Sequence, residues 1–237
     1  MQGSLPTEHT VKYDTRIAIE GFNPIEFKNI SSGMSIGEVM SDIIGSVGVL
    51  MSNPFGSADI SSIGINIDIS DVDNTARILS AQLDKTKVKP GDTVKASVLI
   101  QSYLNQKSRH ELSLDIPEDV KPGKYQLIIS GGNDYKRFLR SAQPHKFSAS
   151  NKDTLVEALD RILSIRKNGL HMVMPLPPSG VVIEDKELQS LPGTKSLLLE
   201  NPKRTLSARP CNRWAGTKND LNKVVFANET IKIEVEE

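Results

Sequence analysis

The chain has 237 residues, enough to bury a sizeable hydrophobic core in roughly one to two domains. Its 29 basic and 29 acidic side chains cancel, so no whole-chain field favours nucleic acid or an anionic membrane as partner. Aromatic residues make up only 5% of the chain, too few for a base-stacking platform, and the single Cys211 excludes an internal disulfide.

Two segments bear on targeting. Residues 1–10 are polar and lack the apolar region of a secretory signal, which predicts a cytosolic chain or one that begins downstream of such a signal. The longest apolar stretch, residues 43–51, contains two glycines and falls well short of the roughly 20 residues that a membrane helix needs. We therefore expect no membrane span in this chain.

Residues 1–60 predict a hairpin followed by a helix. Residues 13–20 and 25–29 have strand patterns separated by a Gly-Phe-Asn-Pro turn. Apolar residues then recur at helical spacing over residues 36–50, and Asn53-Pro54 stops the helix.

Residues 61–145 predict an immunoglobulin-like β-sandwich module. Ile63, Ile65, Ile67 and Ile69 alternate with polar residues, which predicts a half-buried strand. Extended segments separated by Pro-Gly turns follow, and Gly131-Gly132-Asn133-Asp134 closes the run as a turn. The expected strands cover residues 76–83, 93–101, 112–116 and 125–129.

Residues 146–237 predict a helix and further strands. The helix opens at residues 150–153 and ends at Asn168-Gly169, and a stiff connector follows at Pro175, Pro177 and Pro178. The remaining chain predicts strands at residues 170–174, 181–183, 196–199, 224–227 and 230–235, with a polar loop at 201–223. Because residues 1–60 and 146–237 are each too small for a core, we expect them to pack together or against the sandwich, in a β-rich α+β fold.

Catalytic candidates are few. Ser35, in Gly33-Met34-Ser35-Ile36-Gly37, is similar to a serine-nucleophile turn, but a capping box with Glu38 explains it better. The histidines His9, His110, His145 and His171 are scattered and form no local signature. We assign no catalytic residue; the alternative is a hydrolase whose site forms only in the fold, around Ser35, His171 or Cys211.

Metal and cofactor signals are equally weak. On a strand His171 and Met172 point to opposite faces, so core methionines are favoured over a soft-metal site. The carboxylates of Asp68, Asp71 and Asp73 could hold calcium, but the segment lacks the glycine and distal glutamate of an EF-hand, which favours a solvated strand end. Glycine-rich phosphate loops are absent from the sequence. We expect no cofactor and no metal.

The surface candidates are polar or aromatic. Lys203, Arg204, Arg209, Arg213 and Trp214 form a basic cluster that could bind phosphate or sugar, although a solvated loop with Trp214 anchored on the core is favoured. His110, Asn133, Asp134 and Tyr135 fall at loop positions of the expected sandwich. A carbohydrate-binding sandwich would require an exposed aromatic row, which the low aromatic content argues against.

The order of several motifs is similar to that of a known family. Val88-Lys89-Pro90-Gly91-Asp92-Thr93-Val94, Ile116-Pro117, Pro122-Gly123-Lys124-Tyr125-Gln126-Leu127, a helix over residues 154–166 followed by Asn168-Gly169-Leu170, and Leu191-Pro192 occur in this order. Over residues 15–235 the chain resembles the region after the catalytic core in bacterial proteins of the SpoIVB peptidase family. The Gly33 to Glu38 segment lacks the second serine and the proline of that family's Gly-Met-Ser-Gly-Ser-Pro turn, so no catalytic residue is carried over.

The resemblance implies a non-catalytic C-terminal portion of such a protein, or a free-standing relative, outside the cytoplasm in the cell envelope or secreted. The expected function is a binding or scaffolding module for a protein or cell-envelope partner, presented by sandwich loops or a sheet edge.

Overall fold

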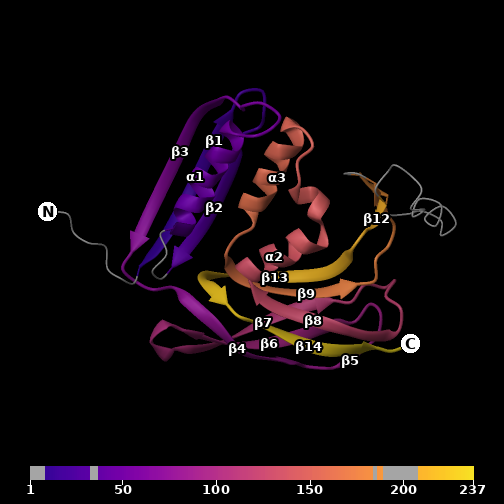
Figure 1. Cartoon of the computed structure of the whole chain (residues 1–237). Coiled ribbons are helices and arrows are strands. Elements are labelled where there is room, and N and C mark those ends of the chain that lie inside the picture. The colour runs from indigo at the N-terminus through magenta and orange to yellow at the C-terminus, as the bar shows by residue number, and fades with distance from the viewer. Residues whose placement is uncertain (1–8, 33–36, 184–185, 189–207) are drawn as a thin grey trace.

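A computed structural model describes residues 9–32, 37–183, 186–188 and 208–237 of the chain. In these residues the protein is a strand-rich α+β fold with three α-helices and three sheets (Figure 1). The predicted fold class is thus confirmed at the level of a β-rich α+β protein. Within the described part of the chain, none of the helices has the length and apolar content that crossing a bilayer requires.

The N-terminal layer is a three-stranded antiparallel sheet in the order β2-β1-β3. Its strands are β1 (Thr10–Ile19), β2 (Ile25–Ser32) and β3 (Ile60–Ser70). Two helices, α1 (Gly37–Met51) and α3 (Lys152–Ser164), pack against it. The sequence placed β3 at the start of the sandwich, but the structure pairs it with β1.

The core of this layer follows from strand alternation. Alternate residues of β1, from Val11 to Ile19, face the helices and are buried. The residues between them lie on the outer face and are half-buried or exposed. Asn151 caps the N-terminus of helix α3, and its side chain accepts a hydrogen bond from the Thr154 N–H in a capping box; the sequence placed the start of the helix at residues 150–153. Val156, Leu159 and Leu163 of α3 complete the same core, so a helix from the C-terminal third serves the N-terminal sheet.

The second layer is one eight-stranded mixed sheet in the order β5-β14-β8-β9-β13-β4-β6-β7. Its strands are β4 (Thr75–Leu83), β5 (Lys87–Val88), β6 (Thr93–Ser102), β7 (Lys107–Asp115), β8 (Gly123–Gly131), β9 (Asn168–Leu176), β13 (Arg213–Phe226) and β14 (Asn228–Val235). One apolar cluster joins residues from both ends of this sheet and from its centre, such as Val88 of β5, Leu112 of β7 and Met172 of β9. Strands before and after residue 145 therefore share a sheet and a core, across the expected domain boundary.

The remaining elements are short or lie between the two layers. They are the helix α2 (Gly132–Ala142), the 3-10 turns η1 (Tyr103–Asn105) and η2 (Pro144–Phe147), and a small sheet of β10 (Val181–Ile183), β11 (Lys186–Leu188) and β12 (Ala208–Pro210). The strand expected at residues 196–199 lies outside the described residues.

Gly131, expected in a turn, ends β8 at a point of close backbone approach. A Cβ atom added there would lie 1.8 Å from the Val225 carbonyl oxygen, which real Cβ atoms do not tolerate. Gly45 in α1, by contrast, faces open space.

We predict that Gly131→Ala destabilises the protein by about 3 kcal/mol or more, because the β13 backbone must move. Gly45→Ala, the control, should stabilise it by up to about 1 kcal/mol through its helix propensity. Urea denaturation of both variants measures the difference, and similar midpoints would contradict the close packing of β8 against β13.

Candidate functional site

The predicted loop candidates Asn133, Asp134 and Tyr135 lie in the first turn of α2 and not in a loop. Sequence analysis did not predict this helix because Gly-Gly-Asn-Asp is a strong turn signal. In the structure Gly131 and Gly132 instead allow other segments of backbone to approach closely. Asp134 forms an ion pair with Arg137 at 3.0 Å and accepts a hydrogen bond from Asn228. Its carboxylate is therefore used within the fold.

Tyr135 belongs to an aromatic cluster that the sequence did not foresee. Its ring stacks on His171 at 4.1 Å between centroids, and Phe138 meets Trp214 edge to face at 5.4 Å. Burial, with the nearby Lys218 charge, lowers the pKa of His171 to about 4, so its imidazole is neutral at physiological pH. Trp214 is thus packed on α2, which fits the favoured interpretation of an anchored tryptophan.

Of the two described residues of the alternative hydrolase, Cys211 does not line the cavity beside His171. A cavity of about 330 Å³ beside His171 is lined by Tyr135, Val173, Trp214, Gly216, Thr217 and Lys218, with no carboxylate or thiol among them. Cys211 is buried, and burial together with Glu187 raises the pKa of its thiol, which disfavours the nucleophilic thiolate. Ser35 lies outside the described residues.

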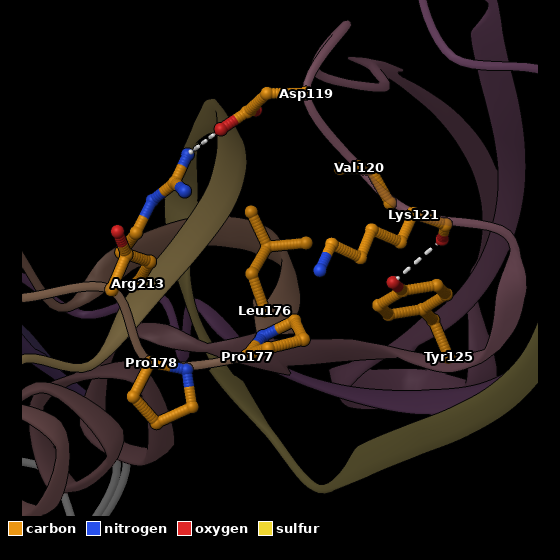
Figure 2. A pocket seen from close by; sticks show the side chains of 9 residues that line it. Asp119, Val120, Lys121, Tyr125, Leu176, Pro177, Pro178 and Arg213 are labelled. Atoms are coloured by element: carbon orange, nitrogen blue, oxygen red, sulfur yellow. Dashed lines mark hydrogen bonds and ion pairs between the residues drawn. The ribbon is translucent and has the colours of Figure 1, made fainter. Parts of the chain in front are cut away.

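The basic cluster is likewise divided. Arg209 and Arg213 lie on β12 and β13 and not in the expected loop, while Lys203 and Arg204 lie outside the described residues. Arg213 donates to Asp119 at 2.7 Å, at the rim of a cavity of about 240 Å³. Figure 2 shows the Lys121 side chain reaching across this cavity toward Leu176. Arg213, one of the surface candidates, is therefore engaged in an exposed ion pair within the chain.

The remaining polar candidates have local partners. His110 on β7 shares a hydrogen bond of 2.9 Å with Ser108, and burial with the Lys223 charge lowers its pKa. Asp73 accepts hydrogen bonds from the Ser32 hydroxyl and the Thr75 N–H. Among the described residues no group of three or more histidine, cysteine or acidic side chains is placed to hold a metal ion.

An exposed apolar surface lies instead on the N-terminal layer, and we name it the α1/β3 surface. The β3 side chains of Ile63, Ile65, Ile67 and Ile69 are 41% to 54% exposed, and those of Met40, Ile44 and Met51 on α1 are 50% to 61% exposed. These seven residues define the surface. The alternation predicted a half-buried strand, in which the face with the isoleucines is covered. The exposure of these residues corrects that prediction, and it arises because no described element covers the helix side of β3.

The strand register fixes the direction of the β3 isoleucines. Ile67 lies opposite Tyr13 and Ile63 opposite Ile17, two β1 residues buried beneath the helices. Directly opposite residues of an antiparallel pair project from the same face of the sheet. The isoleucines therefore project on the face that carries α1.

Helix geometry directs the α1 residues of this surface toward β3. At about 100° per residue, Glu38 and Asp42 fall on one flank of the buried Ile43 position, and Met40, Ile44 and Met51 fall on the other. The acidic flank faces Lys167, which lies beside Asn29 of β2. Because β3 and β2 are on opposite sides of β1, the apolar flank overlooks β3.

Lys167 holds α1 in this orientation. Its side chain is only 6% exposed, and its ammonium lies 2.9 Å from the Asp42 carboxylate and 3.3 Å from Glu38. The Tyr13 hydroxyl donates to Asp42 at 2.6 Å; burial and this contact raise the pKa of Tyr13. A buried ammonium without its carboxylate would be strongly unfavourable, so the pair restricts rotation of α1.

We predict that Lys167→Met destabilises the protein by about 3 kcal/mol, because Asp42 is left buried without its counter-ion. The control Lys28→Met removes the exposed pair of Lys28 with Asp14 and should cost less than about 1 kcal/mol. Chemical denaturation measures both, and equal losses would show that the buried pair contributes no more than the exposed one.

Comparisons of the chain with family models, curated proteins and solved structures found no match.

Proposed function

We propose that this protein is a non-catalytic binding module that receives a protein partner on the α1/β3 surface. One observation carries the proposal: seven large apolar residues, exposed by about half, lie along one helix and along the edge strand of the sheet on which that helix packs. Contiguous apolar surfaces of this kind on soluble proteins mark interaction sites.

The chemistry of the surface fits an extended apolar segment. In the described residues β3 pairs only with β1, so its other edge offers backbone N–H and C=O groups to an added strand. The methionines of α1 supply flexible, polarisable contacts that adapt to a partner's side chains. Backbone hydrogen bonds would provide affinity, and the Ile and Met side chains would select apolar residues on the partner.

The proposal also covers the kind of protein to which this module belongs and the scaffold that carries the binding surface. The motif order that resembles the SpoIVB peptidase family supports an accessory region of a bacterial cell-envelope or secreted peptidase-like protein. The turn-separated strands β6, β7 and β8 support an immunoglobulin-like sandwich as the scaffold of the module. On this interpretation the large sheet supports the structure and the N-terminal layer binds.

Photo-crosslinking in the source cells tests the binding surface. With p-benzoylphenylalanine in place of Ile67, we expect a defined adduct to a protein, because this side chain is 54% exposed on the proposed surface. The same probe in place of Leu79, an exposed apolar residue of β4, is the control and should give no adduct.

Specificity is checked by adding Ile63→Lys to the variant that carries the probe at position 67. This change places a charge within the proposed surface and should abolish the adduct. An adduct of equal yield from positions 67 and 79, or one that Ile63→Lys leaves unchanged, would contradict the proposal.

A further inference from the structure

The edge of β3 lacks the features by which proteins usually prevent strand pairing. Such edges commonly carry lysine, proline or an inward-pointing charge. Over its 11 residues β3 has none of the first two, and its one charged residue, Asp68, lies on the face away from the isoleucines. An edge strand with this composition is suited to pairing.

The sequence of β3 is complementary to itself. In antiparallel pairing about a two-fold axis at Asn66, Ile65 lies opposite Ile67 of a second copy, and Ile63 lies opposite its Ile69. All the isoleucines then meet on one face. On the other face Asp68 lies opposite Gly64 of the second copy, whereas an axis at Asp68 would oppose like charges.

The same axis also brings the apolar flanks of the two α1 helices toward each other. It runs perpendicular to the sheet, so both helices lie on one face of a continuous six-stranded antiparallel sheet. The apolar flanks with Met40, Ile44 and Met51 then face each other across the paired isoleucines. The formal net charge of zero means that two copies do not repel each other through their overall charge.

We propose that the partner of the α1/β3 surface is a second copy of this chain, paired strand to strand through β3 about Asn66. This inference rests on the proposed function, since it uses the same surface, and it names the occupant. The resulting interface is isologous, so it closes after two copies and does not propagate into a fibre.

Sedimentation of the purified full chain tests the association. The wild-type protein should sediment at twice the 26.0 kDa chain mass in the micromolar range. The double variant I65K/I67K should sediment as a single chain, because the axis sets lysine against lysine. The control Leu79→Lys should leave the mass doubled, and circular dichroism checks that each variant is folded.

Disulfide trapping tests the register without disturbing the isoleucines. N66C places the two introduced thiols opposite each other at the axis and should crosslink quantitatively under mild oxidation. In S62C, on the same face of β3, each thiol would lie opposite Ser70 of the second copy, so no crosslink should form. The native Cys211 is buried and is present in both variants, so it cannot account for a difference in crosslinking between them.

The outcomes separate this inference from the proposed function. Wild-type protein at single-chain mass with no N66C crosslink would overturn the second copy as partner, as would equal crosslinking of N66C and S62C. If the probe at Ile67 then forms an adduct with a different protein, the proposed binding function remains. Absence of both the doubled mass and any adduct would overturn both.

Discussion

The arrangement of the N-terminal layer depends on the buried contact of Lys167 with Asp42. Lys167 directly precedes β9 of the large sheet, and its ammonium reaches the acidic flank of α1. Its backbone N–H also donates to Asn29 of β2. One residue therefore connects the two layers and sets which side of α1 turns toward β3, so the exposed apolar surface is a consequence of a polar contact on the other side of the helix.

This arrangement leaves apolar area exposed on β3. In the described residues α3 packs on β2 and α1 packs on β1 and β2, so neither helix packs extensively on β3. The isoleucines of β3 stay about half exposed after the single chain folds, and their further burial must come from association. Their regular alternation over a whole strand makes a partner strand more suitable than a small ligand.

The sequence predicted local structure well and the pairing of the strands poorly. Alternation and capping residues located β1, β2, α1 and α3, because these signals act over a few neighbouring residues. The pairing of β3 with β1, and the mixing of early and late strands in the large sheet, depend on contacts between distant residues and leave no local signal. Helix α2 was missed because its opening Gly-Gly-Asn-Asp has the composition of a turn.

The candidate site was missed for a related reason. An isoleucine that alternates with polar residues has the same pattern whether its face is covered or bare, so exposure of β3 could be found only from the tertiary structure. Polar candidates such as Asp134 and Arg213 were identifiable by type, but the fold pairs them internally. The burial of Lys167 was not predicted, because nothing in the local sequence marks a single lysine before a strand as buried.

Amide hydrogen exchange along β3, measured as a function of protein concentration, tests whether the outer edge of this strand pairs with a second copy. Alternate amides of β3 bond to β1, and the others lie on the edge that we assign to a partner strand. If β3 pairs with a second copy, both sets are protected at concentrations where copies pair, and dilution speeds exchange only of the set on the free edge. Fast exchange of that set at every concentration would contradict this pairing.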